Sequence, residues 1–330
     1  MAVVRIFLLA LITSLLGAVA AVSWLASPIG QPGKTLDLLV EPKASAQAVA
    51  NQVASAGALV NPTALYVWFR LSGQSRQIKA GTYELESDIT PRRLLEKLVN
   101  GEQALRSVTL VEGWTFKQVR QAIDRLDDVR HDSRDMAPQA IMQALGRAGQ
   151  HPEGRFFPDT YRYAKGSSDL GLLQSALKAM DAQLAQAWAA RAPQSPLKSA
   201  DQLLTLASIV EKETGVEADR GPVAAVFHNR LRIGMRLQTD PSVIYGLGDA
   251  FDGNLRKADL QRDTPYNTYT RAGLPPTPIA MPGRSSLLAA AAAPASSALY
   301  FVARGDGSSQ FSATLDEHNR AVNRFQRATP

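Results

Sequence analysis

The chain has 330 residues, of which 45% are hydrophobic and 20% charged, so it is too apolar to be disordered as a whole and long enough for two ordinary domains. It contains no cysteine, which excludes disulfides, thiolate nucleophiles, cysteine zinc sites and a lipid-anchoring cysteine. A net charge of +6 favours an anionic partner, but it does not choose among lipid headgroups, acidic wall polymer and nucleic acid.

An uncharged apolar run from residue 6 to residue 26 follows Arg5 near the start of the chain. As a helix, at about 1.5 Å per residue, it spans roughly 30 Å, the thickness of one hydrocarbon core. A cleaved signal peptide is the alternative, because Ala18-Val19-Ala20 is a small-x-small site. We favour a retained anchor, since the apolar run continues through Trp24 and Leu25. Arg5 favours a cytoplasmic amino terminus, with the bulk of the chain beyond the membrane.

We divide the chain into residues 1–33 (cytoplasmic tip, membrane anchor and linker), residues 34–150 (a small α+β module) and residues 151–330 (a second, mixed domain). In the α+β module a strand-turn-helix pattern occurs three times, around residues 36–53, 82–99 and 107–126. A capping box from Thr115 to Gln118 and a further helix around residues 138–148 are also expected. Such a module is typical of binding or spacing, because nothing in it assembles an acid, a base and a nucleophile.

The second domain begins with predicted helices at residues 169–190, 200–214 and 218–232. A Gly/Pro-rich stretch at residues 234–282 follows, rich in polar and aromatic side chains, and we interpret it as a substrate groove because compact domains rarely leave so long an irregular segment without function. After it come an alanine-rich helix, a strand at residues 299–303, a turn, a short strand and a final helix.

Two carboxylates lie near the end of the helix predicted at residues 200–214. Glu211 borders the stripe formed by Leu203, Leu206 and Val210, whereas Glu213 lies about 200° further round the helix. We therefore expect Glu211 to point inward and Glu213 to point to solvent. A carboxyl partly withdrawn from water has a raised pKa, which suits a general acid. Taken alone, the Glu-Lys-Glu run is more typical of an ordinary solvated helix face.

Longer motifs surround this helix. They are Ala207-Ser-Ile-Val-Glu-Lys-Glu-Thr214, the block from Val226 to Gly246, Pro265-Tyr-Asn-Thr-Tyr269, Gly273-Leu-Pro-Pro276, Lys79-Ala-Gly-Thr-Tyr83, Leu110-Val-Glu-Gly113, Glu153-Gly-Arg-Phe-Phe-Pro-Asp-Thr160, Pro282-Gly283, Tyr300-Phe-Val-Ala303 and His318-Asn319. Together they resemble the YceG-like endolytic murein transglycosylases, the MltG family, over nearly the full length and in the same order. This chain departs from the family pattern chiefly at Arg155 and His228.

The resemblance implies an α+β protein with an N-terminal transmembrane helix, a LysM-like module and a C-terminal catalytic domain at residues 151–330 with a lysozyme-like catalytic helix. It implies a lyase of the bacterial inner membrane, spanning once with its bulk in the periplasm. The family's catalytic residue, the first Glu of the Val-Glu-Lys-Glu-Thr motif, maps onto Glu211.

The expected reaction is cleavage of the MurNAc-GlcNAc β-1,4 bond of nascent peptidoglycan strands, which limits their length. Glycosidases that use water need two carboxylates, and the sequence places only one convincingly. In lytic transglycosylases, which the chain resembles, the muramic acid 6-hydroxyl closes onto C1 and leaves a 1,6-anhydro end. A well-held internal nucleophile gains a large effective concentration, up to roughly 10⁵ M or more. Glu211 would protonate the leaving oxygen and then accept the 6-hydroxyl proton.

Five side chains of the predicted groove are candidates for substrate binding because they offer amides, a carboxylate and aromatic faces to sugars. They are Gln238, Asp240, Tyr266, Asn267 and Tyr269. Asp240 has capping as its alternative role, and Asn267 has a turn. We expect turn or capping roles for Glu112 and Asp159, although Asp159 could also line the groove.

No cofactor and no metal are expected, because the four histidines are scattered without ligand spacing. Expected partners are glycan strands, the inner membrane through residues 6–26, and glycan-polymerising penicillin-binding synthases. The competing hypotheses are a non-catalytic peptidoglycan-binding scaffold and a nucleic-acid binder; the export segment argues against the nucleic-acid binder.

Overall fold

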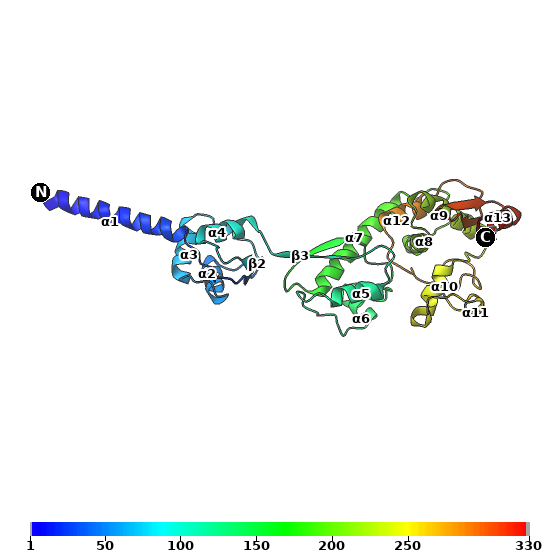
Figure 1. The fold of residues 1–330 in the computed structure, drawn as a ribbon, viewed down its shortest axis with the longest axis horizontal. Helices are drawn as coiled ribbons and strands as arrows, with labels where there is room; N and C mark the ends of the chain where they lie inside the picture. Colours follow the sequence, from blue (N-terminus) through cyan, green and yellow to red (C-terminus); the bar gives the residue numbers. More distant parts are fainter. Residues whose placement is uncertain (1, 328–330) are drawn as a thin grey trace. The chain divides into compact units, whose positions relative to one another are not determined.

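The computed structural model describes residues 2–327, so Met1 and residues 328–330, at the outer ends of the first and last predicted ranges, lie outside the described residues. The chain forms two compact units (Figure 1). Unit 1 comprises residues 1–106 and 162–167, and unit 2 comprises residues 107–161 and 168–330, as far as these are described. Helices and small two-stranded sheets make up both units, which confirms the predicted α+β class.

The first helix, α1 (Ala2–Leu25), contains the predicted anchor. Its segment Phe7–Leu25 has 19 residues with a mean hydropathy of 2.2, long and apolar enough to cross a membrane. The side chains described along this segment are almost all exposed. Apart from its last turn, where Trp24 packs against the core of unit 1, the apolar surface described along this segment is not used to build a protein core.

The rest of unit 1 contains the first two predicted strand-turn-helix repeats. β1 (Leu36–Val40) is followed by α2 (Ala46–Ser55), and β2 (Gly81–Leu85) by α4 (Pro91–Asn100). The two strands pair antiparallel, with Leu36 opposite Leu85 and Val40 opposite Gly81. α3 (Pro62–Leu71) and the 3₁₀ turn Ser75–Gln77 lie between the repeats.

Local chemistry explains where these helices begin and end. The side chains of Ser45, Asn61 and Thr90 accept hydrogen bonds from backbone N–H groups of the first turns of α2, α3 and α4. Proline follows at the start of α3 and of α4, where its missing N–H costs nothing. Gly101 ends α4 in the left-handed conformation, at a φ of 72°.

β3 (Leu105–Thr109) and β4 (Thr160–Ala164) form a second small sheet, and the division between the units passes through both strands. α5 (Phe116–Asp124) begins at the predicted capping box, which is present between Thr115 and Gln118. α6 (Pro138–Ala144) is shorter than predicted.

The structure and the sequence divide the chain differently. The sequence groups residues 107–150 with the first module, whereas the structure packs them into unit 2. Phe116 stacks on Phe156 with ring centroids 5.2 Å apart, and the Gly113 N–H donates to the Met281 carbonyl at 2.8 Å. The third strand-turn-helix repeat is therefore part of the unit that holds the C-terminal helices.

The helical core of unit 2 lies close to the predicted ranges. It consists of α7 (Asp169–Ala189), α8 (Ala200–Glu213), α9 (Glu217–Arg232) and α12 (Arg284–Ala291), and α12 packs against the other three. Every residue from Leu203 to Val210 of α8 is buried, as expected of a helix that is apolar all round. The predicted irregular stretch contains two short helices, α10 (Asp240–Leu247) and α11 (Lys257–Gln261).

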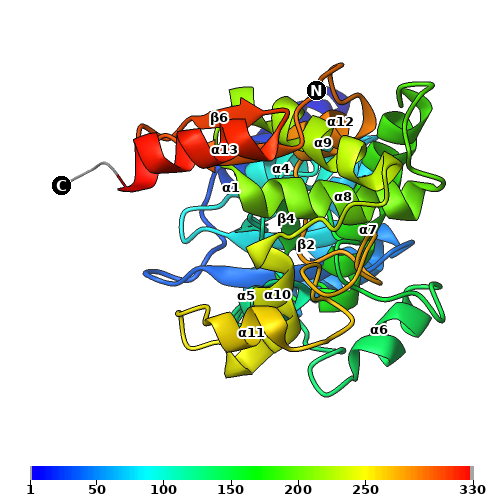
Figure 2. The same cartoon turned by 90° about the vertical axis from the view of Figure 1, so that its right-hand side faces the viewer.

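The last part of unit 2 is a hairpin with a helix against it. β5 (Tyr300–Ala303) pairs antiparallel with β6 (Ser309–Ser312). α13 (Leu315–Val322) packs on both strands and continues into the π-helical turn Asn323–Arg327 (Figure 2).

Candidate active site

The C-terminal end of α8 presents its two glutamates to different surroundings. α7, α9, α10 and α12 all contact α8, so carboxylates on opposite sides of the helix both meet protein. Glu213 is only partly exposed, so the prediction that it points to solvent is wrong. Its withdrawal from water raises the pKa of the Glu213 carboxyl to about 7.

Three neighbouring side chains also change the pKa of Glu213. The Thr239 hydroxyl donates a hydrogen bond to Glu213 Oε1 and lowers the pKa. The negative charge of Asp240 raises it, and the guanidinium of Arg230 lowers it. Burial is the largest cause, so Glu213 is a carboxyl that holds or releases a proton close to neutral pH.

Glu213 faces a cleft of about 660 Å³ within unit 2. Gln238, Asp240 and Tyr269 line it together with Glu213 and Arg230, and its remaining walls come from β5, β6, α13 and the turn after α13. The structure therefore brings three of the five predicted groove residues together around Glu213. A cleft of this size is in the usual range for small-ligand sites.

A network of hydroxyl groups fixes the segment before α10. The Thr239 N–H donates to Thr268 Oγ1 at 3.0 Å, and Ser242 Oγ donates to the Thr239 carbonyl at 2.9 Å. Gln238, the preceding residue, has a φ of 49°, a left-handed conformation that is rare outside glycine. Unusual backbone of this kind clusters at functional sites when its surroundings hold it in place.

Asp240 and Tyr269 form a pair on the cleft wall. The Tyr269 hydroxyl donates to Asp240 Oδ1 at 2.6 Å. Burial, and then the neighbouring carboxylate, raise the pKa of Tyr269, so the hydroxyl keeps its proton as a donor. Asp240 is thus a second carboxylate on the cleft, which the sequence alone did not establish.

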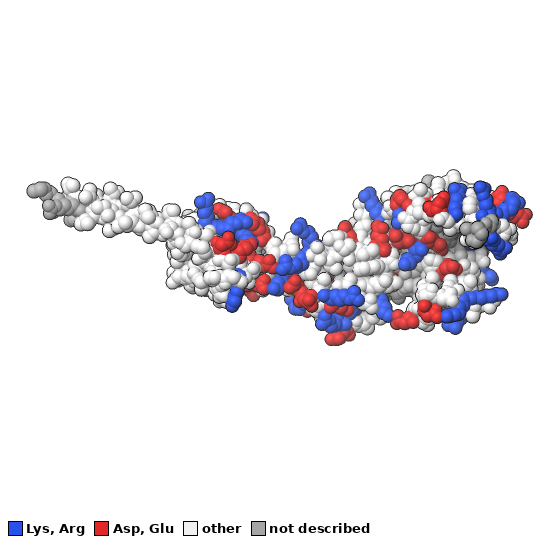
Figure 3. Space-filling model, in the orientation of Figure 1, with Lys and Arg blue, Asp and Glu red and all other residues white. Residues whose placement is uncertain are grey.

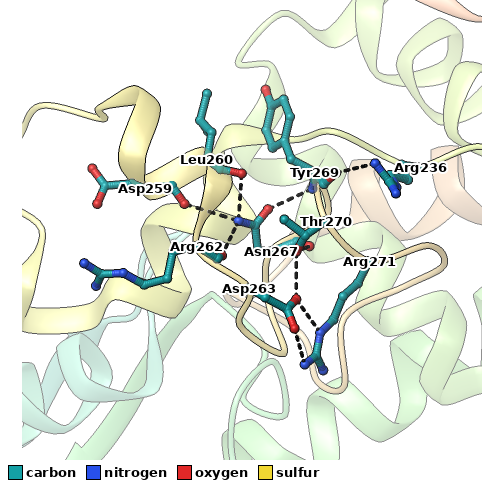
Figure 4. A network of polar contacts seen from close by, with 9 residues as sticks. All are labelled: Arg236, Asp259, Leu260, Arg262, Asp263, Asn267, Tyr269, Thr270 and Arg271. Atoms are coloured by element: carbon teal, nitrogen blue, oxygen red, sulfur yellow. Dashed lines mark hydrogen bonds and ion pairs between the residues drawn. The ribbon is translucent and has the colours of Figure 1, made fainter.

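The other two predicted groove residues do not line the cleft. Asn267 is 1% exposed, and its side-chain amide donates to the carbonyls of Asp259, Leu260 and Arg262 (Figure 4). Its oxygen accepts from the Tyr269 N–H at 2.8 Å. The alternative role of holding a turn is therefore the one the structure supports.

Tyr266 packs by its ring against Tyr245, with centroids 4.9 Å apart, and its hydroxyl is 2.8 Å from Thr277 Oγ1. It thus supports the loop that carries Tyr269 without lining the cleft. Asp159 Oδ1 accepts a hydrogen bond from the N–H of the next residue, Thr160, at 2.6 Å, and Asp159 does not line this cleft. His228, where the chain departs from the family pattern, is buried and lies 2.9 Å from the Ala290 carbonyl.

Glu211, the predicted catalytic residue, lies in a second cluster outside the cleft lining. Its Oε2 accepts the Gly283 N–H at 2.9 Å, and its Oε1 is 3.5 Å from the guanidinium of Arg220. The side chain is only 7% exposed. Both contacts come from donors, and they tie the end of α8 to the start of α12 and to α9.

Glu112 lies beside this cluster. A Cβ atom on Gly283 would come within 1.9 Å of Glu112 Oε1, so only a glycine leaves this space. Burial, and then the negative charge of Glu211, raise the pKa of Glu112. The Lys212 ammonium also contacts the neighbouring Gly113 carbonyl at 3.4 Å. Glu112 therefore lies near the carboxylate of Glu211, a contact that the predicted turn role did not include.

Sequence reasoning missed Glu213, Thr239 and Arg230 as members of the site. The signal for Glu213 was the unbroken apolar and small-residue run from Leu203 to Val210, because a helix that is apolar all round has no solvent face. No local signal identifies Arg230, whose guanidinium donates to the Leu299 and Leu237 carbonyls at 2.7 and 2.6 Å.

These features define a mixed α+β protein with a helical core and a cleft built around one protonatable carboxyl. The model of the YceG-like family matches residues 38–324, and the chain belongs to this family. A Bacillus subtilis (strain 168) protein named endolytic murein transglycosylase is 30% identical over 319 residues, 91% of this chain and 88% of that protein.

A Streptococcus pneumoniae (strain D39) protein of the same name is 30% identical over 283 residues, 74% of this chain and 50% of that protein. The 2.6 Å crystal structure of a YceG-like protein from Listeria monocytogenes is also similar, with 29% identity and a TM-score of 0.55. The match covers 87% of this chain and 99% of that chain.

Proposed function

We propose that this protein is an endolytic lytic transglycosylase, a lyase that cuts the MurNAc-GlcNAc β-1,4 bond inside nascent peptidoglycan strands and so limits their length. The names of its curated relatives support the general activity. The observation that carries the proposal within the chain is a partly buried carboxyl on the wall of a cleft, Glu213, whose pKa is raised to about 7 by its loss of hydration. A general acid works best when its pKa lies near the operating pH.

We assign the proton-donating role to Glu213. Its side chain faces the cleft with Gln238, Asp240 and Tyr269, and its pKa of about 7 leaves a large fraction protonated at neutral pH. Glu211 has the family motif in its favour, but it does not line this cleft, and its carboxylate lies beside the guanidinium of Arg220. Glu211 therefore stays a prediction, and the two residues are separated by matched substitutions.

In the proposed reaction the protonated Glu213 donates its proton to the leaving glycosidic oxygen as the bond from that oxygen to C1 breaks. Positive charge develops at C1, and the muramic acid 6-hydroxyl oxygen then bonds to C1. The ionised Glu213 accepts the hydroxyl proton, which restores the acid and leaves a 1,6-anhydro end. The enzyme therefore consumes no water and ends each cycle in its starting protonation state.

Asp240 makes hydrolysis the alternative reaction. Two carboxylates on one cleft also suit a hydrolase, in which one activates or replaces a water molecule. Asp240 differs from Glu213 in being exposed and in accepting a hydrogen bond from Tyr269. We assign it to substrate positioning, together with Gln238 and Tyr269. The chemical nature of the new strand ends distinguishes the two reactions.

We infer that α1 anchors the protein once in the bacterial inner membrane, with the bulk in the periplasm. The apolar span Phe7–Leu25 supports the anchor. We further propose that the α+β part of unit 1 is LysM-like and binds glycan, and that the catalytic domain acts beside penicillin-binding synthases. An anchored enzyme of this kind meets strands as they emerge from the membrane.

The decisive experiment uses the full-length protein in detergent with purified peptidoglycan strands and mass spectrometry of the products. We compare the wild type with Glu213→Gln, Glu211→Gln and Asp240→Asn. We expect internal fragments with anhydro ends from the wild type, at most a trace from Glu213→Gln, and continued cleavage by Glu211→Gln with its fold intact.

Other outcomes reassign the roles. Loss of cleavage in Glu211→Gln alone, with the wild-type melting temperature, returns the acid to Glu211. Reducing ends that disappear in Asp240→Asn identify a hydrolase. Absence of cleavage by the wild type, with retained binding to strands, supports the peptidoglycan-binding scaffold.

A further inference from the structure

Unit 1 begins directly at the end of α1, without a free tether. Trp24, in the last turn of α1, packs against the unit 1 core. The Ile29 N–H donates to the Ile89 carbonyl at 2.7 Å, and the Leu59 N–H donates to the Ile29 carbonyl at 2.7 Å. The chain is therefore held in unit 1 within four residues of the last residue of α1, Leu25.

α3 is apolar on two of its sides. Leu65 and Phe69 are fully buried in the unit 1 core. On another side of the helix, Val67 is 45% and Leu71 79% exposed, and Leu59, just before the helix, is 64% exposed. Large apolar side chains at one-turn spacing on an exposed face have no role in the core of unit 1.

This exposed face adjoins the end of the membrane helix. Ala21, Trp24 and Leu25 of α1 line a cleft of about 600 Å³ together with residues of α3, among them Val67 and Leu71. Figure 1 shows α3 beside the C-terminal end of α1, and the described atoms of α1 are uncharged in Figure 3. The lipid-exposed surface of α1 thus continues into an apolar surface of unit 1.

The length of α1 gives the depth of this cleft in the membrane. At about 1.5 Å per residue, the 19 residues from Phe7 to Leu25 span about 29 Å, close to the roughly 30 Å hydrocarbon core. Leu25 then lies at the boundary of the hydrocarbon, and Ala21 lies one turn inside it. Because α3 shares a cleft with Ala21, its exposed face is at the level of the headgroups and the first acyl carbons.

The chemistry of α3 fits that level. Its sequence contains no acidic residue, and Arg70 is exposed. The Trp68 indole N–H donates to the Pro91 carbonyl at 3.3 Å while its ring lines the cleft. Tryptophan rings and basic side chains are typical of the membrane interface, and helices that lie there bury their apolar face about 5–10 Å deep.

We propose that α3 is an interfacial helix that inserts Val67 and Leu71 among the lipids of the bilayer that holds α1. The inference rests on the proposed membrane anchoring. Two points of attachment fix the orientation of unit 1 on the membrane, which a single helix does not do. Lipid is favoured over a protein partner because the apolar face is continuous with the membrane-spanning helix itself.

The test exploits the absence of cysteine from the chain. Single substitutions Val67→Cys and Leu71→Cys, labelled with an environment-sensitive dye, are placed in the full-length protein in vesicles of phosphatidylethanolamine and phosphatidylglycerol. Leu39→Cys, on β1 and 59% exposed, is the matched control. Leu16→Cys in α1 reports the anchor separately.

We expect brominated lipid to quench the labels at positions 16, 67 and 71, and aqueous iodide to quench only the label at position 39. Iodide quenching at 67 and 71, with lipid quenching at 16, overturns the interfacial helix and leaves the anchor intact. Protection from both quenchers at 67 and 71 identifies a protein contact, including one with a second copy, and also overturns the proposal. Iodide quenching at position 16 contradicts the anchor itself.

Discussion

Unit 1 and unit 2 differ in the charged side chains that they bury. Among the described residues of unit 1, the buried polar side chains are Thr82 and Lys97, and Lys97 reaches out to the partly exposed Glu86 carboxylate at 2.6 Å. Unit 2 instead buries Glu153, Asp169 and Arg230, and holds Glu213 away from water. The difference fits the functions proposed above: anchoring by unit 1 would need only an apolar core, whereas proton transfer in unit 2 would need a poorly hydrated carboxyl.

The largest expected effect concerns the pH dependence of cleavage. The donor must be protonated, so the rate should fall about tenfold per pH unit above the Glu213 pKa of about 7 and level off below it, as far as Glu213 determines the rate. Glu213→Gln should lower the rate by roughly 10²–10⁴ at every pH. Initial rates of anhydro-end formation measure both. A Glu213→Gln profile that keeps the wild-type descent would assign the titration to another group.

Removal of Asn267 tests whether the loop is structural. Asn267→Ala loses three donations to backbone carbonyls and one bond accepted from the Tyr269 N–H. The amide shares its two N–H groups among these three carbonyls, so the substitution removes about three bonds in all. At about 1 kcal/mol per bond, unfolding of unit 2 should become easier by about 3 kcal/mol. Denaturant titration of the full-length protein in detergent provides the measurement. Wild-type stability combined with a raised KM would instead make Asn267 a glycan contact.

Two glycine substitutions test whether unit 1 and unit 2 unfold independently. A Cβ on Gly30 would lie 2.3 Å from the Glu86 carbonyl oxygen, so Gly30→Ala should destabilise unit 1 by about 2 kcal/mol. A Cβ on Gly154 would lie 2.5 Å from Pro278 Cβ, and Gly154→Ala should weaken unit 2. Hydrogen exchange followed by mass spectrometry locates the loss. Equal loosening of both units in either variant would mean that they unfold together.

The buried carboxyls of unit 2 should also make its stability depend on pH. Burial raises the pKa of Glu153 to about 7 from an ordinary 4.5, as it does for Glu213. Between these values the folded protein keeps a proton that the unfolded chain has released, so stability falls as pH rises, by about 1.4 kcal/mol per pH unit for each group. Glu153→Gln should remove one group's share of the slope. An unchanged slope would contradict the assignment.

The smallest expected effect belongs to Thr239→Val. The Thr239 hydroxyl lowers the pKa of Glu213 by donating to it, so its loss should move the descent of the rate to higher pH. Thr239→Ser keeps the hydroxyl and should keep the wild-type profile. Any shift in Thr239→Val toward lower pH would mean that the hydroxyl does not act on Glu213.

The sequence predicted the elements whose signals are local. The three strand-turn-helix repeats, the capping box at Thr115 and the helices near residues 169–190, 200–214 and 218–232 are all present, because caps and apolar periodicity act over a few residues. Unit 1 also contains α3, which we did not predict. Its apolar residues serve both the core and an exposed face, so it lacks the polar side that marks an ordinary surface helix.

Predictions about the site failed where the answer depended on distant segments. Residue spacing correctly separates the side chains of Glu211 and Glu213, but the packing of α7, α9, α10 and α12 decides which surroundings each one meets. Gln238, Asp240 and Tyr269 line the cleft as predicted groove residues. Asn267 and Tyr266 do not line the cleft because their side chains bind other parts of the loop. No local sequence pattern predicts how this loop folds back.

A large part of the cleft wall is built from residues 300–326, the hairpin β5-β6 and α13 with its terminal turn. Gln326 lines the cleft, so a tag or fusion joined directly after residue 327 begins beside the proposed substrate path. Such an addition can block long glycan strands while short fragments still enter. The activities of tagged and untagged protein on long and short strands therefore indicate how far the bound strand extends along the C-terminal wall.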